Sequence, residues 1–104
     1  MVSEWIRVCR LEEIPQLGAR VVKTGGADIA VFRTADDAVF AVEDKCPHKG
    51  GPLSQGIVFG HQVTCPLHGW IVGLESGEAC APDQGCTRKL PVRLEGDEVM
   101  LGLA

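Results

Sequence analysis

The chain has 104 residues, the length of a single small domain, so we expect one domain over residues 1–104. Its 10 basic and 14 acidic residues give a net charge of −4. This balance argues against a nucleic-acid-binding protein, because such proteins bind phosphates through clustered Lys and Arg. Hydrophobic residues make up 45% of the sequence, which excludes a disordered chain.

In chain order, the sequence consists of short runs rich in Val, Ile and Phe. Glycine and proline interrupt it too often for long helices, and no apolar stripe of period 3.6 is sustained. The only helix-like segment is residues 11–14, at most one turn long because Pro15 ends it. The runs that predict strands are residues 5–11, 19–24, 28–34, 38–43, 57–59, 62–65, 90–95 and 98–103.

Turn-forming residues separate these strands, at Gly25-Gly26, Asp36-Asp37, Gly60-His61 and Gly96-Asp97. Residues 73–88 are rich in Gly, Ser, Pro and Asp and predict a long loop with at most one short strand. Many short strands at this spacing indicate an all-β sandwich or small barrel.

Five cysteines are unusual in so small a chain. Residues 1–7 lack the basic and apolar regions of a secretory signal, and no apolar run approaches the ~18–20 residues that cross a bilayer. We therefore expect a cytoplasmic protein with no membrane partner. Thiols stay reduced in the cytoplasm and an odd number cannot all pair, so clustered cysteines there indicate a metal site.

Two Pro- and Gly-rich loops each combine a cysteine with a histidine. The first contains Cys46 and His48, and the second contains Cys65 and His68. Residues 49–64 are enough for a hairpin that returns the second loop beside the first. A [2Fe–2S] centre with two different irons needs two Cys on one iron and two His on the other. The pattern therefore predicts such a centre.

Two other interpretations of these residues remain open. A structural zinc site also uses two Cys and two His, although zinc fingers group like ligands and these loops mix them. Alternatively, the cysteines are small core residues and the histidines are surface residues.

The two half-motifs, followed by Gly69-Trp70, resemble the Rieske [2Fe–2S] motif. Residues 46–56, 63–68 and 83–87 further resemble the small subunit of assimilatory NAD(P)H-dependent nitrite reductase. The resemblance implies a small all-β Rieske-type sandwich or barrel with a cluster-binding subdomain of two loops, at about residues 44–82.

The resemblance also implies roles for the four residues. Cys46 and Cys65 would bind the inner iron, and His48 and His68 would bind the outer iron through Nδ1. The implied cofactor is a Rieske [2Fe–2S] cluster. High-potential Rieske proteins have hydroxyl residues where this chain has Trp70 and Val72, so we expect a low reduction potential.

By the same resemblance, the partner is a large subunit with flavin, sirohaem and an iron–sulfur cluster. The assembled oxidoreductase would reduce nitrite to ammonia with NADH or NADPH in nitrate assimilation. This chain would carry electrons without being catalytic on its own. One alternative is a Rieske ferredoxin that delivers electrons to an aromatic-ring dioxygenase. A second is a zinc-stabilised interaction module without redox function.

The remaining thiols and the third imidazole have simpler interpretations. Cys9 lies in a strand pattern and is expected to pack in the core. Cys80 and Cys86 lie in the long loop, as free thiols or as a redox-active disulfide. His61 is expected to be solvated at a hairpin tip.

Overall fold

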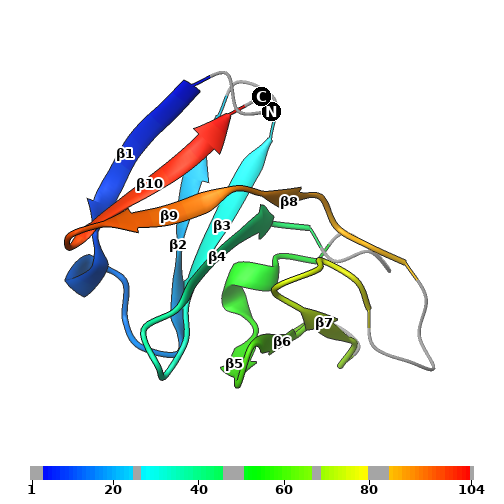
Figure 1. The fold of residues 1–104 in the computed structure, drawn as a ribbon. Coiled ribbons are helices and arrows are strands. Elements are labelled where there is room, and N and C mark those ends of the chain that lie inside the picture. The colour runs from blue at the N-terminus through cyan, green and yellow to red at the C-terminus, as the bar shows by residue number, and fades with distance from the viewer. Residues whose placement is uncertain (1–3, 25–26, 46–50, 67–68, 80–84, 104) are drawn as a thin grey trace.

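The computed structural model describes residues 4–24, 27–45, 51–66, 69–79 and 85–103 (Figure 1). In these residues the regular structure consists of strands and two single-turn 3₁₀ helices, and no helix is long and apolar enough to cross a membrane. The elements are β1 (Glu4–Arg10), η1 (Leu11–Glu13), β2 (Gly18–Lys23), β3 (Asp28–Arg33), β4 (Val39–Glu43), η2 (Leu53–Gln55), β5 (Ile57–Phe59), β6 (Gln62–Thr64), β7 (Ile71–Gly73), β8 (Lys89–Leu90), β9 (Val92–Glu95) and β10 (Glu98–Leu103).

The strands form three antiparallel sheets with the orders β1-β10-β9, β2-β3-β4-β8 and β5-β6-β7. Figure 1 shows β1 beside β10 near the two ends of the chain, and the third sheet below the other two. We call the first two sheets the base and the third the small sheet. The predicted all-β class is confirmed.

Strand β3 separates the two hydrophobic cores of the molecule. Its side chains alternate, so that Ile29 and Val31 pack in one core while Ala30 and Phe32 pack in the other. All four are buried, which explains why β3 is a continuous apolar run instead of an alternating one. The first core lies within the base, and the second joins the base to the small sheet through Val58, Val63, Cys65, Val72 and Leu74.

The predicted strands are confirmed, with ends shifted by at most one residue, except for the run 90–95. Pro91 divides that run, because its nitrogen has no hydrogen to donate to a ladder. The residues before it form β8 and pair with β4, whereas those after it form β9 and pair with β10. One predicted strand therefore contributes to both sheets of the base.

Of the helix-like residues 11–14, the first three form the single turn η1, as predicted. The sequence did not reveal η2 or β7. The sequence allows one short strand in the long loop, but the described residues between β7 and β8 contain none. Isolated bridges instead join Val72 to Ala79 and Glu78 to Cys86. The first bridge pairs the long loop with β7 of the small sheet, and the second pairs two parts of the loop with each other.

The predicted turns at Asp36-Asp37, Gly60-His61 and Gly96-Asp97 each connect two neighbouring strands. Asp37 has φ +63° and Gly60 has φ +54°, a left-handed conformation that Asp and Gly tolerate better than most residues. Gly25-Gly26 lies outside the described residues.

Candidate metal centre

Cys65 is the only one of the four predicted ligands within the described residues; Cys46, His48 and His68 lie outside them. Cys65 follows β6 and is 2% exposed in the core that joins the base to the small sheet. No group of three or more Cys, His, Asp or Glu suited to a metal is present in the described part of the chain. The described residues therefore show how the two ends of each loop are held.

Two backbone hydrogen bonds close the second loop. The N–H of Cys65 donates to the carbonyl of Trp70 over 2.7 Å, and the N–H of Gly69 donates to the carbonyl of Cys65 over 3.1 Å. Trp70 packs against the core that contains Cys65. The segment that carries the second half-motif is thus held at both ends by the pairing of β6 with β7.

A carboxylate ties the two flanks of the first loop together. Asp44 accepts hydrogen bonds from the N–H and from the hydroxyl of Ser54, both over 2.7 Å. Its own N–H donates to the carbonyl of Asp28 in β3 over 2.9 Å. The residue that follows β4 is therefore bonded both to η2, after the first loop, and to β3 of the base.

Gly56 brings the two loops into backbone contact. A Cβ atom at Gly56 would lie 2.0 Å from the carbonyl oxygen of Thr64, the residue before Cys65. The exit of the first loop therefore lies directly on the entry of the second, and Figure 1 shows η2 beside β5 and β6. This contact sets the residue that follows η2 against the residue that precedes Cys65, and it extends no further toward Cys46, His48 and His68, which lie outside the described residues.

The described surroundings fit a metal–thiolate centre. Cys65 has no disulfide partner, is buried among Val63, Val72 and Leu74, and lies on a backbone held by short hydrogen bonds. Apolar walls exclude water from a cluster, and a fixed backbone orients its ligands. The donor set of the two motifs, two Cys and two His, is the set that a Rieske cluster uses.

The other described thiols differ in exposure. Cys9 is 2% exposed in the core of the base, which confirms the packing role expected for it, and burial raises the pKa of its thiol. Cys86 is an exposed free thiol. Cys80 lies outside the described residues.

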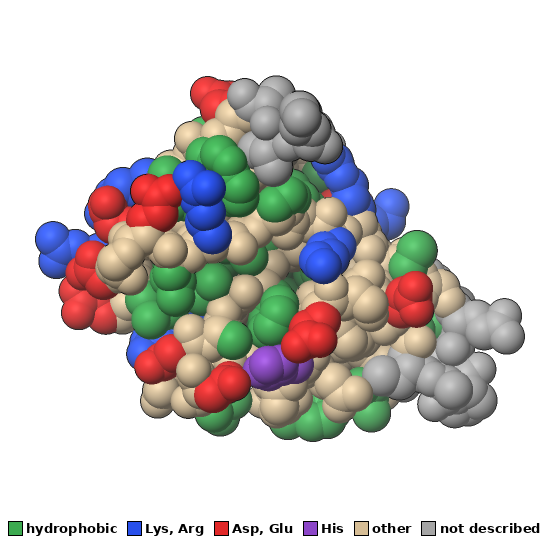
Figure 2. All heavy atoms as spheres, viewed as in Figure 1, with side chains coloured by type: hydrophobic (Ala, Val, Ile, Leu, Met, Phe, Trp, Pro, Cys, Tyr) green, Lys and Arg blue, Asp and Glu red, His purple; other side chains and the backbone are tan. Residues whose placement is uncertain are grey.

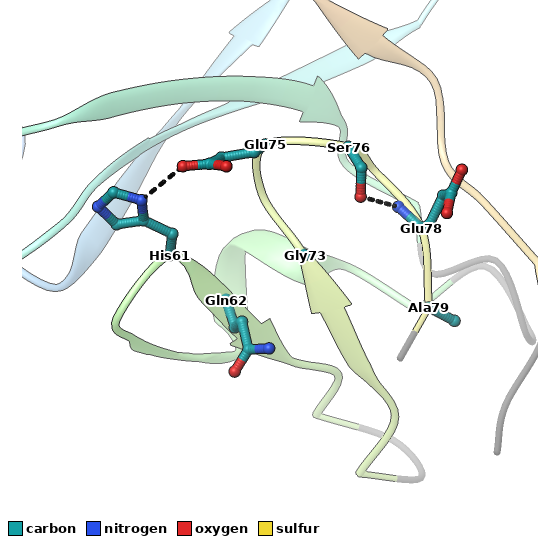
Figure 3. Close-up of a pocket in the computed structure, with 7 residues that line it drawn as sticks. All are labelled: His61, Gln62, Gly73, Glu75, Ser76, Glu78 and Ala79. Atoms are coloured by element: carbon teal, nitrogen blue, oxygen red, sulfur yellow. Dashed lines mark hydrogen bonds and ion pairs between the residues drawn. The ribbon is translucent and has the colours of Figure 1, made fainter. Parts of the chain in front are cut away.

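His61 lies on the hairpin turn between β5 and β6 with its side chain 36% exposed, as expected, and its ring also contacts two carboxylates. Its Nδ1 lies 2.8 Å from Glu75 Oε1, and its Nε2 lies 3.1 Å from Asp36 Oδ2. Figure 3 shows the direct contact between His61 and Glu75, and both residues line a groove of about 520 Å³. The sequence carried no signal of this arrangement, because the three residues lie far apart in the chain.

Comparison with known proteins identifies the fold and the cofactor. Residues 4–91 match the model of the Rieske [2Fe–2S] domain. The chain belongs to the Rieske [2Fe–2S] domain family. It is a Rieske-type electron-transfer domain, and the family implies a Rieske [2Fe–2S] cluster as its cofactor.

The similar proteins include dioxygenase ferredoxins and candidate small subunits of nitrite reductase. The ferredoxin component of the naphthalene 1,2-dioxygenase system of Pseudomonas aeruginosa is 30% identical over 105 residues, covering 100% of both chains. Among solved structures, a chain in the complex of reduced oxygenase and oxidized ferredoxin of carbazole 1,9a-dioxygenase has a TM-score of 0.84 and 28% identity, covering 94% of this chain and 92% of the other. A chain described as a candidate small subunit of NADPH nitrite reductase has a TM-score of 0.83 and 26% identity, covering 97% and 99%.

Proposed function

We propose that this chain is the electron-carrying small subunit of an NAD(P)H-dependent nitrite reductase that reduces nitrite to ammonia. Cys46 and Cys65 hold one iron, and His48 and His68 hold the other. When bound, the cluster supplies a reversible one-electron change. In this proposal residues 1–104 form one domain, which the pairing of β1 with β10 supports. The partner is a cytoplasmic large subunit with flavin, sirohaem and a further iron–sulfur cluster.

The described part of residues 83–87 carries this proposal. This segment supplies the resemblance to nitrite reductase small subunits outside the cluster motif, and the likeness to the candidate small subunit extends over 97% of the chain. Gly85 accepts a hydrogen bond from the N–H of Ala79 over 2.9 Å, and the N–H of Thr87 donates to Gly77 over 2.8 Å. Gly85 and Cys86 are exposed. A rigid, exposed segment loses little conformational freedom when a partner docks on it.

The same segment is tied to the base beside the first loop. The hydroxyl of Thr87 donates to the carbonyl of Glu43 over 3.2 Å, and the N–H of Glu43 donates to the carbonyl of Arg88 over 2.8 Å. Glu43 is the last residue of β4, from which the chain continues into the first motif. A partner that contacts Cys86 would therefore lie near the flank of the cluster loops, as short-range electron transfer requires.

A second candidate is a Rieske ferredoxin that delivers electrons to an aromatic-ring dioxygenase. The full-length similarity to a dioxygenase ferredoxin, 30% identity against 26% for the candidate nitrite reductase small subunit, favours it. Both candidates keep the same cluster and the same one-electron role. The zinc-stabilised module is disfavoured, because the family to which the chain belongs binds a [2Fe–2S] cluster.

The two candidates predict different proteins bound to the chain. A tagged holo-protein expressed in its native organism should co-purify with a sirohaem protein, detected by its absorption spectrum and by mass spectrometry. Cys86→Arg should weaken that complex at least about tenfold without changing the cluster spectrum, because it places a bulky charge on the exposed segment. Leu94→Arg, on β9 of the base, is the matched control and should leave binding unchanged. Co-purification of a ring-hydroxylating oxygenase instead would establish the second candidate.

The reduction potential should lie near the low end of the Rieske span, at about −150 mV. Neither Trp70 nor Val72 has a side-chain hydroxyl, so neither position offers one to the cluster. Fewer donors leave the extra negative charge of the reduced state less stabilised. Protein-film voltammetry measures this value, and a potential near about +300 mV would contradict the argument.

A further inference from the structure

His61 joins three elements that are distant in the chain. It lies on the turn between β5 and β6, while Asp36 lies on the turn between β3 and β4, and Glu75 follows β7. Its Nδ1 is 2.8 Å from Glu75, and its Nε2 is 3.1 and 3.3 Å from the two oxygens of Asp36. In the space-filling view, the one histidine among the described residues reaches the surface beside acidic side chains (Figure 2).

The two contacts require a particular protonation state. Ionised carboxylates only accept hydrogen bonds, and a neutral imidazole has a single N–H, so a neutral ring can satisfy one carboxylate at a time. Only the imidazolium can donate to Asp36 and Glu75 together. With a neutral ring, a nitrogen lone pair would face a carboxylate oxygen, which is repulsive.

Further contacts fix the ring and its partners. The Phe40 ring lies with its centroid 5.0 Å from that of His61. The hydroxyl of Thr34 donates to Asp36, and the N–H of Leu74 donates to the carbonyl of His61 over 2.9 Å. The base supplies Asp36 and Phe40, whereas the small sheet and the chain after it supply His61 and Glu75. The ring therefore connects the base to the sheet that carries Cys65.

We propose that His61 is a protonation-controlled clasp between the base and the small sheet, which holds Asp36 and Glu75 as an imidazolium and releases Asp36 when the ring loses its proton. Asp36 is the partner released, because its contacts are longer than that of Glu75. The clasp lies at the start of β6, and Cys65 follows the end of β6. Deprotonation therefore weakens the packing of the small sheet on the base without acting directly on a proposed ligand.

The charges around the ring favour the imidazolium. The turn before β4 contributes Asp36 and Asp37, and the chain after β7 contributes Glu75 and Glu78, whereas Phe40 of β4 is uncharged. The nearby cation Arg33 is paired with Asp37 over 2.8 Å. Hydrogen bonds to Glu75 and then to Asp36 raise the pKa of His61, and those from Thr34 and His61 lower the pKa of Asp36.

These shifts define the pH range of the clasp. A raised histidine pKa contributes stability that is fully present below about 6.5, the value of the unfolded chain, and is lost as pH rises through the folded value. The lowered pKa of Asp36 contributes stability above about 3.9, which is lost as pH falls through its folded value. The clasp is therefore closed in weakly acidic solution and opens toward alkaline pH.

An NMR titration of the His61 ring in the cluster-containing protein tests the clasp. The chain has three histidines, and the other two are proposed iron ligands, so His61 gives the imidazole signal free of direct metal contact. Its pKa should exceed 6.5, and Asp36→Asn and Glu75→Gln should each lower it by about half a unit or more. Glu78→Gln, which lines the same groove without a hydrogen bond to His61, should change it less.

A second measurement tests the stability that the clasp contributes. The difference in Tm between the native protein and His61→Gln should be largest at pH 5.5–6 and should shrink toward zero above the measured pKa of His61. The proposal is overturned by a His61 pKa at or below 6.5, by a pKa that neither carboxylate variant lowers, or by a Tm difference independent of pH. The identity of the electron-transfer partner does not affect either measurement.

Discussion

Replacing His68 with alanine should abolish cluster binding, whereas replacing His61 with alanine should leave the cluster in place. Loss of one imidazole leaves an iron without a ligand that the chain can replace, so the cluster should not assemble. Acid-labile sulfide and iron should fall from about two of each per chain to near zero, and the visible absorption should disappear. Cys65→Ala should have the same effect, because it removes the buried thiolate donor.

The two histidine variants form a matched pair, since each removes one imidazole from a turn or loop of the cluster-bearing half. Far-ultraviolet circular dichroism should show that both retain their strands, because the core of the base packs without any residue of the two loops. An His68→Ala protein that kept its full sulfide content would contradict the ligand assignment. One zinc and no sulfide in the native protein would contradict the cluster itself.

Local pattern was enough to predict most of the strands and turns. The residues of β3 and β4 are rich in Val, Ile and Phe, and Gly60-His61 is a turn whatever surrounds it. The pairing of β8 and β9 with different sheets was not predictable in the same way. It follows from two causes, the missing N–H of Pro91 and the position of β4. The sequence shows the proline, but the position of β4 is known only from the folded structure.

The candidate site shows the same division. Two short motifs predict the four ligands, because metal chemistry restricts residue type and spacing. No sequence pattern predicts the supporting contacts. Asp44 binds Ser54 across the first loop, and His61 meets Asp36 and Glu75 across three elements. No local rule shows which of the fourteen acidic residues will bind Ser54 or His61.

Replacing Gly56 with alanine should destabilise the protein by about 3 kcal/mol or more and reduce the amount of bound cluster. The added Cβ would lie 2.0 Å from the Thr64 carbonyl oxygen and 3.1 Å from Val63 Cγ2. The first of these is a backbone atom next to Cys65, so relief of the clash requires the start of β5 to move away from the end of β6. Thermal denaturation should show a Tm lower by more than about 10 °C, and iron analysis should show incomplete loading.

Gly60→Ala distinguishes this steric effect from the conformational freedom of glycine. A Cβ at Gly60 would meet nothing within 4 Å, but its φ of +54° is unfavourable for alanine and should cost about 1 kcal/mol. Gly56 has φ −81°, which alanine adopts without strain, so its larger effect must come from contact between the loops. Equal destabilisation by the two variants, or full iron content in Gly56→Ala, would show that the cluster loops do not depend on this contact.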